Sequence, residues 1–263
     1  MKTVVFITGC ASGIGKSLSL SFYNKGYNVV ITDINYEKLN WTNQLEKERI
    51  LVEKLDVRDY SNWEDLINKT LNKFSKIDIL INNAGIMNSD YIWNMKVEDI
   101  QNEIDTNLKG VVIGSMIASK IMIKQGHGHI INISSLAGIV PIPGISIYTA
   151  TKFAVRGFSI AIAYELKKFN VFVSVICPDA VKTPLIENVK DKPSSAIVFS
   201  GFKILDIKDV EKAVFKAIKT KKLEILIPLH RSIMAKLVNT FPSLGFLFEK
   251  PLTYIGLKRI KKI

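Results

Sequence analysis

Short apolar runs alternate with segments of helical periodicity along most of this chain. A short apolar run bounded by turn residues is typical of a buried strand, whereas apolar residues three and four positions apart are typical of a helix packed on a sheet. Strands are predicted at 3–7, 29–32, 50–52, 77–81, 129–133, 171–176 and 223–227. Helices are predicted between Gly15 and Gly26 and at 60–74, 97–124, 147–169 and 206–220.

This alternation predicts an α/β fold, a doubly wound parallel sheet of the Rossmann type with helices on both faces. Residues 1–228 are expected to form a single domain, within which 185–205 has no strong period and is interpreted as a lid. Residues 229–263 are expected to form a C-terminal helical extension that is apolar and basic. Ligands of such sheets bind where the strands end, so the residues at these ends are the candidates for chemistry.

The charge of the chain is unevenly distributed. Its formal net charge is +12. Residues 230–263 contain seven Lys or Arg and a single acid, Glu249, a balance of +6, and the rest of the excess is spread thinly. This distribution argues against an extended nucleic-acid groove. The chain has only two cysteines, Cys10 and Cys177, which favours a reduced, cytoplasmic setting. It has no apolar run of about 20 residues, so a membrane-spanning helix is not expected.

A glycine-rich turn joins the first predicted strand to the first helix. It reads Thr8-Gly9-Cys10-Ala11-Ser12-Gly13-Ile14-Gly15. Glycines let the backbone approach a pyrophosphate closely, and the start of the helix offers unpaired amides and the positive end of its dipole. The strand–turn–helix context therefore indicates a dinucleotide site rather than an ordinary turn.

Asp33 follows the second predicted strand, eighteen residues after Gly15. A carboxylate there accepts hydrogen bonds from both adenosine ribose hydroxyls and repels a 2′-phosphate. No Lys or Arg adjoins Asp33, which is followed by Ile34 and Asn35. We therefore expect NAD to be preferred over NADP; an N-cap role is the alternative.

Tyr148 and Lys152 lie four residues apart in the predicted helix 147–169, on one face and one turn apart. A neighbouring cation lowers the pKa of a phenol from about 10 toward the range in which it exchanges protons. Asn107, inside 97–124, is a further candidate because a buried asparagine usually has a defined hydrogen-bond partner. His127 and His129 are placed in an exposed turn, without a metal-binding or catalytic role.

Together the motifs resemble those of the short-chain dehydrogenase/reductase family over residues 3 to about 228. They occur in the family's order and spacing as Thr8-Gly9-x-x-x-Gly13-x-Gly15, Asp56-Val57, Asn82-Asn83-Ala84-Gly85, Asn107, Ser135, Tyr148-x-x-x-Lys152 and the loop Pro178 to Thr183. Ser135 is preferred to Ser134 because the family's serine lies thirteen residues before its tyrosine. One position departs from the family, which has Pro-Gly where this chain has Pro178-Asp179.

The resemblance implies four catalytic residues. Tyr148 exchanges a proton with the substrate oxygen, and Ser135 hydrogen-bonds that oxygen. Lys152 holds the nicotinamide ribose and lowers the pKa of the tyrosine, while Asn107 anchors a water that links Lys152 to solvent. The implied cofactor contacts are Gly9, Ser12, Gly13, Ile14, Gly15, Asp33, Asp56, Val57, Asn83, Ala84, Gly85, Tyr148, Lys152, Pro178, Val181 and Thr183.

The resemblance predicts an NAD(P)-dependent oxidoreductase acting on an alcohol or ketone. The alternative is a catalytically silent member that uses bound dinucleotide as a redox or partner-binding signal. The presumed substrate segments, 87–96, 136–146 and 185–205, are rich in apolar residues: Met87, Tyr91, Trp93, Ile139, Ile142, Val198 and Phe199. They predict either a hydrophobic substrate or a lid that packs on itself.

Two expectations concern contacts with other molecules. The long apolar helices 97–124 and 147–169 are those through which family members commonly pair, which predicts a homodimer or homotetramer. The tail, 229–263, combines apolar residues with the basic end Leu257-Lys258-Arg259-Ile260-Lys261-Lys262. Folding over the substrate mouth, covering a neighbouring subunit and peripheral contact with a membrane all fit this composition.

Overall fold

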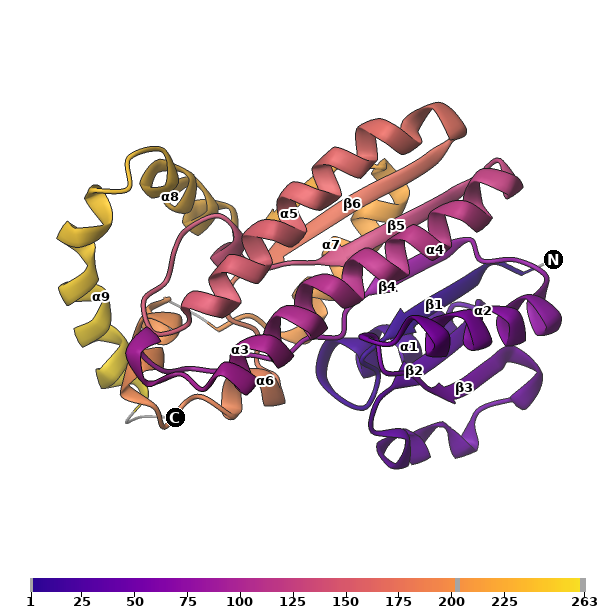
Figure 1. Cartoon of the computed structure of the whole chain (residues 1–263), viewed down its shortest axis with the longest axis horizontal. Coiled ribbons are helices and arrows are strands. Elements are labelled where there is room, and N and C mark those ends of the chain that lie inside the picture. Colours follow the sequence, from indigo (N-terminus) through magenta and orange to yellow (C-terminus); the bar gives the residue numbers. More distant parts are fainter. Residues whose placement is uncertain (1, 202–203, 261–263) are drawn as a thin grey trace.

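A seven-stranded parallel sheet runs through the centre of the protein (Figure 1). The computed structural model describes residues 2–201 and 204–260. The strands are β1 (Val4–Thr8), β2 (Asn28–Asp33), β3 (Ile50–Lys54), β4 (Ile79–Asn82), β5 (Gly128–Ile133), β6 (Val171–Pro178) and β7 (Glu224–Ile227). Their order, β3-β2-β1-β4-β5-β6-β7, reverses between β1 and β4. The prediction of a doubly wound parallel sheet is confirmed.

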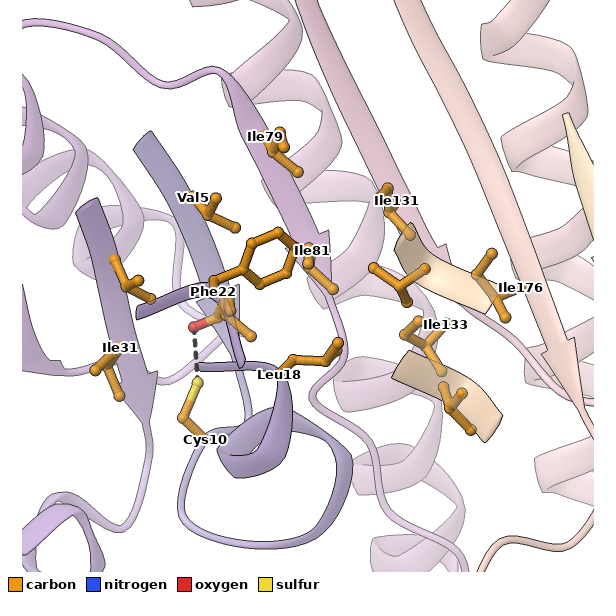
Figure 2. Packing of buried hydrophobic residues seen from close by; sticks show 14 of the residues in the cluster. Val5, Cys10, Leu18, Phe22, Ile31, Ile79, Ile81, Ile131, Ile133 and Ile176 are labelled. Atoms are coloured by element: carbon orange, nitrogen blue, oxygen red, sulfur yellow. Dashed lines mark hydrogen bonds between the residues drawn. The ribbon is translucent and has the colours of Figure 1, made fainter. Parts of the chain in front are cut away.

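Helices cover both faces of the sheet. On one face, α1 (Gly13–Asn24) and α7 (Ile207–Thr220) contribute to a core that includes Leu18, Phe22 and the strand residue Ile31 (Figure 2). On the other face, the core includes residues of α2 (Tyr60–Phe74), α4 (Gly110–Gln125) and α5 (Ser146–Leu166). Strands buried on both faces read as continuous apolar runs, as in β1, where every residue is buried.

The predicted helix 97–124 is interrupted near its middle. It consists of α3 (Val97–Ile104), a π-helical turn (Asp105–Lys109) and α4. Asn107 lies in the π-helical turn, fully buried. Its Oδ1 accepts the Ile86 amide at 2.8 Å, and its Nδ2 donates to the Ile86 carbonyl at 2.8 Å. The turn thus directs a polar side chain to the loop after β4; such π-turns are frequent at functional sites.

The lid and the tail pack against each other beyond the sheet. After β6 the chain forms α6 (Pro184–Glu187) and a 3₁₀ segment (Pro193–Ser200). After β7 it forms α8 (Leu229–Thr240) and α9 (Leu244–Ile260), and α9 lies along the 3₁₀ segment. Figure 1 shows both tail helices, in yellow, at one end of the molecule. Within this chain, the tail helix α9 therefore folds back on the lid.

The placement of both histidines in an exposed turn is wrong for His129. Its side chain is buried in β5, and its Nε2 lies 2.8 Å from Ser174 Oγ of β6. Burial lowers its pKa to about 3, so the ring is neutral at neutral pH. The strand begins one residue earlier than predicted, at Gly128, and both faces of this central strand are covered. His127 is exposed.

Candidate active site

A cleft of about 800 Å³ opens where the strands end. It is lined by every predicted cofactor residue except Gly15, and by Ser135. Asn107 does not line it. The structure therefore brings together residues from six of the seven sequence motifs, together with Asp33, and two predicted residues, Gly15 and Asn107, do not line the cleft.

The glycine turn forms one end of the cleft. Gly9 and Gly13 have φ values of +72° and +54°, which other residues adopt only with strain. A Cβ on Gly15 would lie 2.0 Å from the Gly9 carbonyl oxygen, so Gly15 is needed for close packing rather than for lining. Asn83 Nδ2 donates to the carbonyls of Thr8 and Gly9 at 2.9 and 3.1 Å. The Asn83 side chain therefore holds the turn in place.

Asp33 stands at the end of β2, beside the glycine turn. Its Oδ2 accepts the Ala11 amide and its Oδ1 accepts the Asn35 amide, both at 2.9 Å. These bonds fix the carboxylate at the edge of the cleft. Lys38 also lines this part of the cleft, a cation that inspection of the adjoining residues missed.

Asp56 does not face the cleft as an isolated carboxylate. Arg58 Nε and Nη2 donate to its two oxygens at 2.6–3.1 Å, which lowers the pKa of Asp56. Arg58 Nη1 also donates to Asn102 Oδ1 at 2.9 Å. Arg58 was missed in the sequence; an acid and an arginine two residues apart were the available signal.

Tyr148 and Ser135 meet at the other end of the cleft. Burial raises the pKa of Tyr148, and its hydrogen bond with the Ser135 side chain lowers it in part. The net direction is opposite to the lowering expected from Lys152, because the phenol is only 7% exposed. Ser135 Oγ accepts the Ala137 amide at 3.1 Å, which sets the direction of the hydroxyl.

Lys152 lies one turn after Tyr148 and is buried. Its Nζ donates to the Ile133 carbonyl at 2.9 Å and lies 5.4 Å from the centre of the Tyr148 ring. Burial lowers the pKa of Lys152 to about 8. The pKa of the ammonium group is thus close to neutral pH, where it can release and take up a proton, which suits a proton relay.

A buried carboxylate that the sequence analysis did not consider lies behind this group. Glu103 is fully buried, and both its carboxylate oxygens lie 3.4 Å from the Asn88 amide. Burial raises the pKa of Glu103 to about 7. Its position one turn before Asn107 was the signal that could have found it.

Asp179, which replaces the family's glycine, forms an ion pair with the tail. Its Oδ2 lies 2.7 Å from Arg231 Nε of α8, and both residues line the cleft. Burial raises the pKa of Asp179, and Arg231 offsets this in part. Asp179 is not among the residues with positive φ, so its backbone is not strained. The departure from the family thus links the loop after β6 to α8.

The predicted substrate residues divide into three groups. Met87, Ile142 and Val198 line the cleft. Ile139 and Phe199 are buried in the core at 1% and 2% exposure. Tyr91 and Trp93 stack on each other, 4.9 Å between ring centres, and Trp93 is 75% exposed. The tail adds Arg231 to the cleft, which no motif indicated.

The fold and the cleft define a dinucleotide-binding protein with a tyrosine and a lysine at its reactive end. The family model described as "short chain dehydrogenase" matches residues 3–194. The chain therefore belongs to the short-chain dehydrogenase/reductase family of oxidoreductases.

Three similar proteins illustrate this relationship. A 3-oxoacyl-[acyl-carrier-protein] reductase of Synechocystis is 36% identical over 197 residues, 72% of this chain and 78% of the relative. A Burkholderia phymatum short chain dehydrogenase/reductase in complex with NAD has a TM-score of 0.83 at 25% identity, covering 93% of this chain and 95% of that structure. ElxO with NADP bound has a TM-score of 0.76 at 31% identity, covering 86% of this chain and 98% of that structure.

Proposed function

We propose that this protein is an NAD-dependent oxidoreductase that interconverts an alcohol and a ketone. The observation that carries the proposal is the meeting of Tyr148, Ser135 and Lys152 in the same cleft as the glycine turn and Asp33. When bound, the dinucleotide supplies or accepts the hydride. The Tyr148 hydroxyl exchanges a proton with the substrate oxygen, and the Ser135 hydroxyl donates a hydrogen bond to it.

The relay behind the tyrosine is built from buried groups. Lys152 holds the nicotinamide ribose and, with a lowered pKa of about 8, passes protons between Tyr148 and the water that leads to solvent. Asn107 is proposed to anchor the relay water. Its side chain is already committed to Ile86, so it also fixes the loop after β4.

The residues around the glycine turn fit a dinucleotide. A Cβ on Gly9 would lie 2.8 Å from Ala84 Cα, so side chains are excluded where the backbone must approach a pyrophosphate. Asp33, held at the edge of the cleft, would bind the adenosine ribose and repel a 2′-phosphate, which supports a preference for NAD. Lys38 and Arg58 would attract that phosphate, so a comparison of turnover with NADH and NADPH tests the preference directly.

The apolar part of the cleft supports a hydrophobic substrate. Met87, Tyr148, Ile186 and Val198 belong to one buried cluster around the reactive end. The Synechocystis relative is named for a 3-oxoacyl group, a ketone on an acyl chain. A panel of ketones and alcohols of increasing chain length, assayed with NADH and NAD⁺, should show kcat/KM rising with chain length; no turnover of any of them would contradict the proposal.

The silent alternative shares the cofactor site but not the reaction. Because all four catalytic positions carry the family's residues, we favour the enzyme. A silent protein would be stabilised thermally by NADH without oxidising it in the presence of any ketone, so a thermal-shift screen run beside the turnover assay separates the two.

We also propose that the tail, 229–263, contacts a membrane peripherally. We further propose that the protein assembles as a homodimer or homotetramer through α4 and α5. Met116 of α4 and Tyr164 of α5 are exposed at 38% and 73%, which supports a further contact over these helices. Light scattering at micromolar concentration tests the assembly; a monomer would contradict it.

A further inference from the structure

The apolar stripe of α8 faces outward. Leu229, Ile233 and Leu237, four residues apart, are exposed at 70%, 61% and 52%. The inner side of the helix instead carries the buried Ser232 and Ala235. A surface helix normally turns its apolar stripe to the core and its polar side to water. The reversed orientation of α8 indicates a surface that contacts something other than water.

The second tail helix, α9, is apolar on both sides. Its inner side packs on the lid, where a Cβ on Gly256 would lie 1.8 Å from the Ala196 carbonyl oxygen. Its outer side exposes Phe246, Leu247 and Tyr254 at 84%, 70% and 59%. Exposed apolar surface of this extent on two adjacent helices marks an interaction site.

The charge of this outer surface indicates what it contacts. Lys250 and Lys258 of α9 are exposed, whereas the ammonium group of Lys236 of α8 pairs with Glu224 at 3.1 Å. Over 229–260 the acids consist of Glu249 alone, and the sequence continues with Lys261 and Lys262. Aromatic and leucine side chains beside lysines suit the boundary of an anionic bilayer, where the apolar groups enter the interface and the cations meet head groups. Across the described residues, every helix is too short or too polar for a transmembrane span.

We propose that the outer face of α8 and α9 docks on an anionic lipid bilayer and that this contact serves the active site. The proposal rests on the proposed hydrophobic substrate. Gly256 lies directly against Ala196, so α9 packs closely on the lid, and the next lid residues, Ile197 and Val198, line the cleft. One helix therefore contacts lipid on its outer side and supports the cleft wall on its inner side, so that a long-chain alcohol or ketone reaches the cleft from the bilayer.

Co-sedimentation with vesicles tests the docking. Vesicles of phosphatidylcholine, with and without phosphatidylglycerol, are mixed at low salt with the full-length protein, with Phe246→Glu/Leu247→Glu, and with the control Tyr36→Glu/Tyr60→Glu. The control adds the same charge at exposed aromatic positions in the N-terminal half. We expect the wild type and the control to sediment with the anionic vesicles and the tail variant to bind about tenfold less.

Two results would overturn the docking: wild type that stays in the supernatant with anionic vesicles, or a tail variant that binds as well as the wild type. If the tail variant instead dissociates an oligomer in light scattering and the wild type does not bind lipid, the face is a subunit interface. Turnover of a short, water-soluble ketone with NADH, measured without lipid, reports separately on the proposed reaction.

The coupling to the lid has its own test. Gly256→Val must separate α9 from Ala196, whereas Gly245→Ala adds a Cβ that meets Val238 at an ordinary 3.6 Å. With a long-chain ketone, anionic vesicles should raise the turnover of the wild type and of Gly245→Ala several-fold. Gly256→Val should bind vesicles and turn over the short ketone but lose this stimulation. Stimulation equal to that of the wild type would contradict the coupling.

Discussion

The two ends of the cleft are built in different ways. The end of the cleft at the glycine turn, the proposed adenosine end, is built mainly on one short stretch, in which β1, the glycine turn, α1 and β2 follow each other directly. Asp56, Val57 and Asn83 join it from the loops after β3 and β4. The other end, the proposed substrate end, is assembled from the loops after β4 and β6, the lid and Arg231 of α8, which are far apart in the sequence. Close backbone packing of the glycine turn, supported by the Asn83 side chain, holds the first end. The second end includes an ion pair between distant segments, Asp179–Arg231.

This difference suggests that the two ends can change independently. A glycine turn tolerates little variation, because a side chain at Gly9 or Gly15 would collide with neighbouring backbone. The substrate end tolerates a new pair of side chains, since Asp179 and Arg231 introduce a link that the family's glycine cannot form. Variants of each end should therefore affect different steps.

The largest effect is expected at the reactive end. Tyr148→Phe removes the hydroxyl that exchanges the proton and should lower turnover by about 10² or more. Dinucleotide affinity and the melting temperature should stay close to those of the wild type. Tyr164→Phe, at an exposed tyrosine of the same helix, is the matched control and should be fully active. Near-normal turnover of Tyr148→Phe in a chemistry-limited assay would remove this tyrosine from the mechanism.

The next effect concerns the link between the substrate end and the tail. Arg231→Met leaves the Asp179 carboxylate buried without its partner, which should destabilise the protein by about 2 kcal/mol. The KM for the ketone should rise several-fold while NADH affinity stays unchanged. Combining Arg231→Met with Asp179→Gly removes both charges and should recover most of the stability. Urea denaturation of the three variants measures this, and equal stability of Arg231→Met and the wild type would speak against the link.

A smaller effect is expected at the adenosine end. Asp33→Asn keeps one side-chain oxygen, which can accept one of the two neighbouring amides, and removes the charge that repels a 2′-phosphate. The ratio of kcat/KM for NADPH to that for NADH should rise about tenfold, since Asp33 is partly exposed and its field is screened. Arg231→Met should leave this ratio unchanged. An unchanged ratio in Asp33→Asn would show that other groups, such as Lys38, set the preference.

The smallest effect concerns Glu103 and depends on pH. Because the pKa is raised from 4.5 to about 7 on folding, the native state holds this proton more tightly, and stability is lost as pH rises through that window. Glu103→Gln avoids the buried charge but leaves amide donors to be satisfied. Relative to the wild type it should gain about 1 kcal/mol between pH 6 and pH 7. Parallel pH profiles of the two proteins would contradict the assignment.

The sequence predicted the features that depend on short-range pattern. The strands, most helices and the residues that gather at the strand ends follow from apolar runs and glycine turns, and the glycine turn and Asp33 were found this way. His129 was misplaced because a histidine next to a glycine turn looks exposed until the covering of β5 is known. The π-helical turn at Asn107 could not be predicted from the spacing of apolar residues.

Contacts between distant segments could not be predicted in the same way. Arg231 was recognised only as one basic residue of the tail, and its partner, Asp179, only as a departure from the family. Their ion pair depends on where α8 begins relative to β6. The outward orientation of the Ile233–Leu237 stripe of α8 was likewise hidden, because an apolar stripe on a surface helix normally faces the core.

The central claim is that this cleft transfers a hydride from NADH to a ketone with Tyr148 as the proton donor. Its most direct test uses NADH deuterated at the transferred position, a panel of long-chain ketones and mass spectrometry of the product. The wild type should form an alcohol that carries the deuterium, and Tyr148→Phe should form about 10² less in the same time. Binding of NADH without deuterium transfer to any ketone by the wild type would contradict the claim and favour the silent alternative.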